Sequence, residues 1–169
     1  MKIIRFGLLS VLSLFVVITA ITLFIPSHIR ISRAVNMNAG SETIMQEIGD
    51  LKKWKYWYPG FDTLSIIPVS GTADRLTEAR IASTSTTIVL TANGTTEVLA
   101  QFNSGNSKPV TGGWKVITYS SNDSLTVQWY LDFSLHWYPW EKFLSLTYDK
   151  MYGQQMEQGL KTLKKNVER

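Results

Sequence analysis

The chain has 169 residues, of which 44% are hydrophobic and 18% are charged. This composition excludes a disordered chain and is typical of one globular domain with a short additional segment. Lysine and arginine number 17 against 13 aspartates and glutamates, and two of the cations, Lys2 and Arg5, stand at the extreme N-terminus. The rest of the chain is close to neutral, so it lacks the strongly basic character of nucleic-acid-binding domains, and we expect no nucleic-acid partner.

The chain contains no cysteine and only two histidines, His28 and His136. The lack of cysteine excludes disulfides, thiolate metal sites, iron–sulfur clusters and cysteine nucleophiles. His28 lies beside the apolar N-terminal segment and His136 has no second imidazole with which to pair, so no metal site is predicted. No cofactor and no catalytic residue is predicted either. Function is expected to depend on carboxylates, hydroxyls, aromatic side chains or the shape of the fold.

Residues 6–25 form a run of twenty residues without a charge. As a helix this run spans about 30 Å, the thickness of the hydrocarbon core of a bilayer. A cleaved signal peptide has a shorter apolar core of roughly 7 to 15 residues and a small-residue cleavage site. This run instead ends in Phe24, Ile25 and Pro26. We predict an uncleaved transmembrane anchor in residues 1–28, with a signal peptide and a buried core helix as the alternatives.

The charges that flank this run differ little between its two ends. Lys2 and Arg5 precede it, and Arg30 and Arg33 follow it. Cytoplasmic ends of membrane spans carry an excess of positive charge, and the free amino group adds one at the N-terminal end. This favours a single-pass protein with its N-terminus inside the cell and its domain outside the cytoplasm.

Two short helices are expected after a first strand. Apolar and polar residues alternate over 29–37, which predicts the strand. Ser41 is placed to cap a helix over 42–48. Asp50 is placed to cap a second helix over 51–57, which a Pro-Gly pair ends.

The middle of the chain predicts an antiparallel meander. Asn93 and Gly94 separate two apolar runs and predict a hairpin turn, because both residues accept a positive φ. In the last run, Trp129, Leu131 and Phe133 alternate with mostly polar residues, as in a strand with one covered face. The expected strands lie at 80–82, 86–90, 95–102, 114–119 and 125–138, with turns at 103–111 and 120–124.

Beyond Pro139 the apolar period changes to 3.6, which predicts one long amphipathic helix. Its stripe is expected to cover the apolar face of the sheet, with Lys161, Lys164 and Lys165 on the opposite side. The stripe consists of Leu144, Tyr148, Met151, Tyr152, Met156, Leu160, Leu163 and Val167.

Two segments resemble a known superfamily. The run Asp50-Leu51-x-x-Trp54-x-x-Trp57-Tyr58-Pro59 resembles the D-L-x-x-W-x-x-W-x-P signature of the SRPBCC superfamily, which includes START-like, Bet v 1-like and polyketide cyclase-like proteins. The segment 149–164 resembles the terminal helix of its membrane-anchored bacterial members. The resemblance implies an α+β helix-grip fold over 29–169, in which a curved antiparallel sheet of five or six further strands encloses a long C-terminal helix. Residues 64–82 depart from the pattern, because they lack its glycine-rich, tryptophan-containing stretch.

A helix-grip fold implies a largely apolar cavity between the sheet and the terminal helix. Buried tyrosines there are of special interest, because a phenol needs a polar partner and can orient a ligand. The alternative for each residue is plain core, since aromatic side chains often only bury area, and Trp54 and Trp57 fit this structural role best. The candidate cavity residues are Trp57, Tyr58, Phe61, Trp114, Trp129, Phe133, Tyr148, Met151, Tyr152 and Met156.

Asp132, Ser134 and His136 have the residue types of a hydrolase triad. Alternate residues of a strand lie roughly 7 Å apart, beyond the roughly 3 Å that a nucleophile and its base require. We therefore expect these three residues to belong to the solvated face of the last strand.

Three classes of function remain. The leading one is a membrane-tethered binding module for an apolar or amphipathic small molecule, lipid-like or polyketide-like. The second is an enzyme of the cyclase or dehydratase type, in which the cavity folds its substrate. The third is a protein-interaction module, because the resemblance includes proteins that act as chaperone cofactors.

Overall fold

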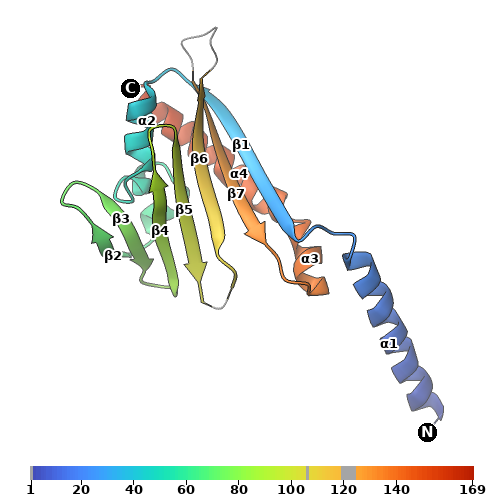
Figure 1. Ribbon diagram of the computed structural model, residues 1–169. Coiled ribbons are helices and arrows are strands. Elements are labelled where there is room, and N and C mark those ends of the chain that lie inside the picture. Colours follow the sequence, from blue (N-terminus) through green and yellow to red (C-terminus); the bar gives the residue numbers. More distant parts are fainter. Residues whose placement is uncertain (1, 106, 119–124) are drawn as a thin grey trace.

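The computed structural model describes residues 2–105, 107–118 and 125–169, and has the α+β architecture that the sequence predicts (Figure 1). A seven-stranded antiparallel sheet has the order β1-β7-β6-β5-β4-β3-β2, and the C-terminal helix α4 packs on one face. The elements are α1 (Lys2–Thr22), β1 (His28–Met37), α2 (Ser41–Ile48), η1 (Trp54–Tyr56), η2 (Phe61–Thr63), β2 (Ile66–Gly71), β3 (Leu76–Ile81), β4 (Thr86–Asn93), β5 (Glu97–Ser104), β6 (Val110–Thr118), β7 (Leu125–Ser134), α3 (Pro139–Ser145) and α4 (Tyr148–Val167).

Strands β1 and β7 pair along their full lengths, from His28 opposite Ser134 to Met37 opposite Leu125. The predicted alternation holds within β7, where Trp129, Leu131 and Phe133 are all buried. The strand ends at Ser134, four residues before the predicted end at residue 138. The Leu135 amide donates to the Ser27 carbonyl at 2.8 Å, and α3 begins at Pro139. Proline fits the first turn of a helix, where its missing N–H is not needed.

The single long terminal helix was a wrong prediction, because the chain forms α3 and α4 with a break at residues 146–147. The Thr147 hydroxyl donates to the Leu144 carbonyl within this break. The predicted apolar stripe is also rotated at its start, where Leu144 and Met151 are 55% and 52% exposed. The buried face of α4 consists of Gly153, Met156, Gly159, Leu160 and Leu163.

Glycines let α4 approach the rest of the domain closely. A Cβ at Gly159 would lie 2.8 Å from the Trp129 ring and 2.9 Å from Cδ of Pro59. Nearby on the helix, Asp149 and Glu157 both pair with Arg33 of β1 at 2.9 Å. These contacts position α4 across β1 and β7.

The two helices predicted after β1 take a different form. Helix α2 forms as expected, but the Ser41 hydroxyl donates to the Thr95 carbonyl and makes no cap. The second predicted helix is reduced to the short 3-10 turn η1. Asp50 does not cap η1, whose N-cap residue is Lys53 and makes no side-chain cap hydrogen bond; the Asp50 carboxylate instead accepts the Lys52 amide, in the turn before η1, and the Leu76 amide, each at 3.0 Å. The same side chain therefore joins the turn to β3.

The segment 64–82 forms two strands, β2 and β3, where the sequence predicted only 80–82. The hairpin between β4 and β5 is confirmed, but its turn is displaced: Asn93 ends β4 and pairs with Val98, the Gly94 amide donates to the Glu97 carbonyl, and neither Asn93 nor Gly94 has the positive φ on which the prediction rested. The turn predicted at 120–124 lies outside the described residues.

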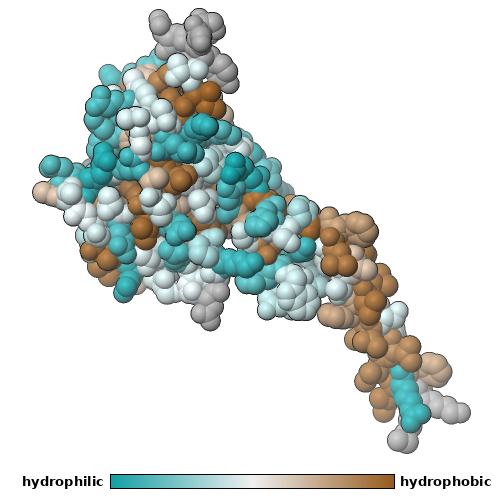
Figure 2. Space-filling view, viewed as in Figure 1, coloured by the Kyte–Doolittle hydropathy of each residue, from teal (hydrophilic) through white to brown (hydrophobic). Residues whose placement is uncertain are grey.

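Helix α1 projects from the end of the domain, at the point where β1 begins (Figure 1). Figure 2 shows hydrophobic side chains along this helix. Its segment Ile3–Thr22 has 20 residues with a mean hydropathy of 2.3, and its apolar side chains lie outside the core. One N-terminal apolar helix of this length fits a membrane span or a signal sequence.

Candidate functional site

An aromatic cluster fills one part of the space between the sheet and the helices. Trp54 is fully buried at its centre, and its indole N–H donates to the Ile48 carbonyl at 2.7 Å. Its ring stacks on Tyr58 with the centroids 4.9 Å apart, and meets the edge of Trp114 at 5.1 Å. Trp57 is 2% exposed and packs against both Trp54 and Trp114. The D-L-x-x-W-x-x-W-x-P segment thus forms a rigid wall.

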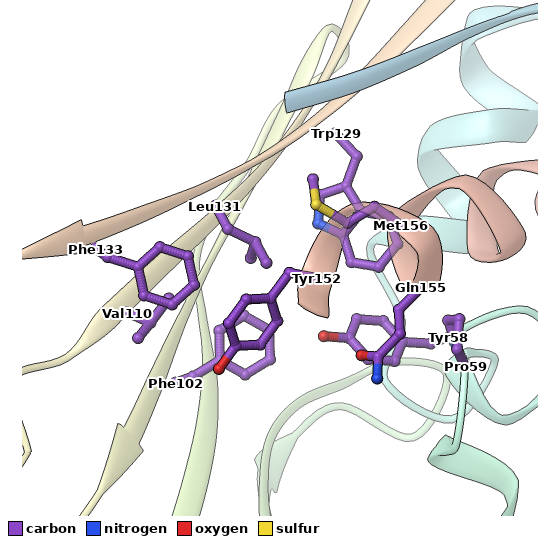
Figure 3. A pocket seen from close by; sticks show the side chains of 10 residues that line it. All are labelled: Tyr58, Pro59, Phe102, Val110, Trp129, Leu131, Phe133, Tyr152, Gln155 and Met156. Atoms are coloured by element: carbon purple, nitrogen blue, oxygen red, sulfur yellow. The ribbon is translucent and has the colours of Figure 1, made fainter. Parts of the chain in front are cut away.

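A cavity of about 200 Å³ lies beside this wall, between the sheet and α4 (Figure 3). Figure 3 shows side chains from three sources around it: the loop after η1, strands β5 to β7, and α4. The lining is mostly apolar, and consists of Tyr58, Pro59, Phe102, Val110, Trp129, Leu131, Phe133, Tyr152, Gln155 and Met156.

A wider and more polar pocket of about 610 Å³ adjoins the cavity. The two spaces share Phe102, Val110, Phe133 and Tyr152 as wall residues, so we call the wider one the mouth. The remaining residues of the mouth come from the β5–β6 loop, the end of β7 and the start of α3 and α4: Ser104, Ser107, Lys108, Ser134, Leu135, His136, Tyr138, Glu141 and Tyr148. Polarity therefore rises from the cavity to its mouth.

The polar groups that line the inner cavity are the phenols of Tyr58 and Tyr152 and the amide of Gln155, which can donate and accept hydrogen bonds. Burial raises the pKa of Tyr58 far above its ordinary value, and neighbouring Tyr152 raises it further. The phenol therefore keeps its proton near neutral pH and can donate it in a hydrogen bond. The indole N–H of Trp129 is buried and has no hydrogen-bond partner among the described residues. The Trp114 indole N–H is in the same state, and both groups are closed off from the cavity space, so their burial is a cost of packing the aromatic cluster.

The predicted cavity residues fall into three groups. Tyr58, Trp129, Phe133, Tyr152 and Met156 line the inner cavity, and Tyr148 lines the mouth. Trp57, Phe61 and Trp114 are buried in the core and line neither space.

Met151 does not line either space, because its side chain is half exposed. It directly precedes Tyr152 in α4, and neighbouring helix positions point about 100° apart. Since Tyr152 faces the cavity, Met151 turns outward.

Sequence reasoning missed five lining residues: Pro59, Phe102, Val110, Leu131 and Gln155. The alternation of β7 contained a signal for Leu131, which lies between Trp129 and Phe133 on the same face. Phe102 and Val110 pair with each other across β5 and β6. Their position on the cavity depends on sheet curvature, which local alternation does not reveal.

The three residues of the rejected triad have separate partners. Asp132 pairs with Arg30 at 2.6 Å, and the Ser134 hydroxyl lies 3.2 Å from Nδ1 of His28. Nδ1 of His136 lies 3.0 Å from the Glu141 carboxylate. Within the described residues, no cluster of three or more histidine, aspartate or glutamate side chains is arranged to hold a metal ion.

No family model and no curated protein sequence matches this chain. Solved structures do match. A START superfamily protein from Mycobacterium smegmatis is 17% identical with a TM-score of 0.57, covering 82% of this chain and 97% of that one. The protein XoxI from Bacillus cereus is 13% identical with a TM-score of 0.56, covering 84% and 96%.

A third similar structure is the di-domain ARO/CYC protein StfQ from the steffimycin biosynthetic pathway. It is 10% identical with a TM-score of 0.60, and the match covers 83% of this chain and 51% of StfQ. These likenesses establish a START-like helix-grip fold for this chain.

Proposed function

We propose that this protein is a membrane-tethered binding module for an apolar or amphipathic small molecule. The observation that carries the proposal is the cavity between the sheet and α4, with its apolar wall and polar mouth. Ligand pockets are typically concave, mostly apolar and equipped with a few polar groups that orient the ligand. Tyr58, Tyr152 and Gln155 are such groups in the inner cavity.

The two spaces favour an elongated ligand. The inner cavity of about 200 Å³ is smaller than a typical small-molecule site of roughly 300 to 1,000 Å³. A ligand of ordinary size would extend past the shared residues Val110 and Phe133 into the mouth. Its apolar part would lie beside Leu131 and Met156, and its polar part near Lys108. An amphiphile has this distribution of polarity.

The tether predicts that the intact protein sediments with membranes and resists alkaline extraction. Residues 27–169 are expected to be soluble and to unfold cooperatively, because the hydrophobic core contains no residue of α1. Fractionation and thermal unfolding of the two forms check this expectation. A native N-terminus near residue 21 would instead identify α1 as a signal peptide.

For the cavity, residues 27–169 are expected to bind cis-parinaric acid, a fluorescent fatty acid, saturably and at one site. Val110→Trp places a large ring where the cavity meets its mouth, and should weaken this binding by about tenfold or more, equivalent to about 1.4 kcal/mol. Fluorescence titration of both proteins measures the difference, and native mass spectrometry of the intact protein tests for a co-purified ligand.

Tyr152→Ala and Met151→Ala form a matched pair on α4. Tyr152→Ala should change the affinity for cis-parinaric acid. It should lower the free energy of unfolding by less than the roughly 3 to 5 kcal/mol that is typical of a fully packed aromatic residue, because the Tyr152 ring borders the cavity and makes fewer contacts. Met151→Ala should change neither quantity appreciably, because Met151 lies outside the cavity. Full destabilisation by Tyr152→Ala, together with no saturable binding, would favour the protein-interaction module.

A cyclase-type enzyme is the second candidate, and the His136–Glu141 pair is the observation that favours it. The pair lies in the mouth, and Glu141 engages Nδ1 of His136. This arrangement leaves Nε2 as the nitrogen that would exchange a proton with a bound molecule. Turnover of a bound polyketide chain that His136→Gln abolishes, with binding retained, would establish an enzyme.

A further inference from the structure

Large apolar side chains gather on the outer surface of α3 and its flanking residues. Trp137, Trp140, Phe143, Leu144 and Leu146 are 67%, 64%, 41%, 55% and 66% exposed, and we call these five residues the α3 face. The aromatic rings are ordered by contacts through Tyr138, which stacks on Trp140 at 4.9 Å and lies 5.1 Å from Trp137. Single exposed apolar residues are ordinary on protein surfaces, but a group of this size indicates contact with an apolar partner.

The α3 face lies at the base of α1. The Lys142 side chain is buried, and its ammonium group donates to the Ile25 carbonyl at 2.6 Å. This bond joins α3 to the segment that leaves α1. Leu23 and Phe24, at the same junction, are 77% and 90% exposed. Figures 1 and 2 show that α3 is adjacent to the end of the apolar α1 helix.

The position of the α3 face beside the C-terminal end of α1 indicates a lipid bilayer as its partner. If α1 spans a bilayer, its C-terminal end lies at the boundary between the hydrocarbon core and the headgroup layer. The headgroup layer on that side is about 5 to 8 Å thick. Groups held against that end lie at the same depth. Tryptophan is enriched at this boundary, because one part of its ring system is apolar and its N–H forms hydrogen bonds.

We propose that the α3 face inserts into the headgroup layer of the same membrane that α1 crosses. The proposal rests on the membrane tether proposed above. The mouth contains Tyr138 and Glu141 from the same segment, so insertion places the mouth against the bilayer. A ligand then enters the cavity from the lipid phase without crossing water. The expected ligand class is a molecule that is itself dissolved in the bilayer.

The absence of cysteine from the chain allows a direct test with single spin labels. Leu144→Cys and Leu146→Cys place labels on the α3 face, where their exposure makes the substitutions tolerable. Gln158→Cys is the matched control, because it is exposed on α4, about 15 Å along that helix from its first residue, Tyr148, at 1.5 Å per residue. Leu14→Cys reports on the tether itself.

The full-length chain is reconstituted into phosphatidylcholine vesicles at a low protein-to-lipid ratio, and label collisions with oxygen and with a water-soluble nickel chelate are measured. Labels at 144 and 146 are expected to collide severalfold more with oxygen, relative to nickel, than the label at 158.

If the label at 14 is in hydrocarbon while those at 144 and 146 behave like the one at 158, the docking proposal is wrong and the tether stands. If the label at 14 is also in water, the tether fails. Strong spin–spin coupling at 144 or 146 without protection from nickel would indicate contact between copies of the chain, which also overturns the proposal.

Discussion

Ending the chain after Thr147 is expected to abolish the cooperative fold. The truncation removes α4, including Met156, Leu160 and Leu163, which are at most 1% exposed. It also uncovers the sheet residues beneath them. Each large side chain contributes about 1.5 to 3 kcal/mol when buried, against a total stability of about 5 to 15 kcal/mol for a domain. The loss therefore exceeds what the remaining domain can tolerate.

Thermal unfolding of residues 27–147, followed by circular dichroism, measures this effect against residues 27–169. The expected product is insoluble, or melts without a cooperative transition. Removal of α1 is the matched control, because α1 contributes no residue to the core. A truncated protein that melts cooperatively would show that the sheet is stable without the helix that it encloses.

The sequence was sufficient to predict the fold because its strongest signals agree with one another. The alternation over 29–37 and in β7 identifies two strands that pair along their full lengths. The Asn93-Gly94 signal identifies a second pairing, that of β4 with β5, and the change to a 3.6 period after Pro139 places the helices at the end of the chain. Asp50 and the tryptophans that follow it carry the resemblance; in the structure Asp50 joins the turn before η1 to β3, and the tryptophans form the packed wall.

The errors in secondary structure arise where tertiary contacts compete with local pattern. Leu144 and Tyr148 have helical spacing, but the chain turns between them and leaves Leu144 on the exposed α3 face. The inward side of α4 includes Gly153 and Gly159, which no hydrophobic pattern reveals. Gly153 packs against Arg33 and Gly159 against Trp129, too closely for a Cβ at either position. Because these partners are far away in the sequence, the local pattern does not reveal the contacts.

The cavity was only partly predictable for a related reason. Residue type identifies Tyr58 and Tyr152 as candidates, but whether an aromatic ring borders a cavity or a filled core depends on how far helix and sheet are held apart. Trp57 and Trp114 pack edge to face with centroids 6.0 Å apart, and so belong to the filled part. Phe102 follows Val98 and Ala100 at alternate positions of β5, so alternation places it on their face, but it does not reveal that this end of the face borders a cavity.

Trp54→Ala is expected to have the largest effect of any single substitution discussed. The side chain is fully buried, contacts five aromatic rings within 6.1 Å, and donates its N–H to the Ile48 carbonyl. Replacing a packed aromatic residue by alanine lowers the free energy of unfolding by about 3 to 5 kcal/mol. Urea unfolding of residues 27–169 measures the loss.

Two further variants separate the sources of this stability. Trp54→Phe retains a ring but leaves the Ile48 carbonyl without its donor, and should lose less than Trp54→Ala but still about 1 to 3 kcal/mol. Trp140→Ala is the matched control, because Trp140 is 64% exposed and most surface substitutions change stability by about 0.5 kcal/mol or less. Because Trp54 stacks on Tyr58, Trp54→Ala should also weaken the binding of cis-parinaric acid. Equal stability of the Trp54→Ala and Trp140→Ala variants would contradict the role of the tryptophan wall, and would mean that the cavity is held open by the sheet and α4 alone.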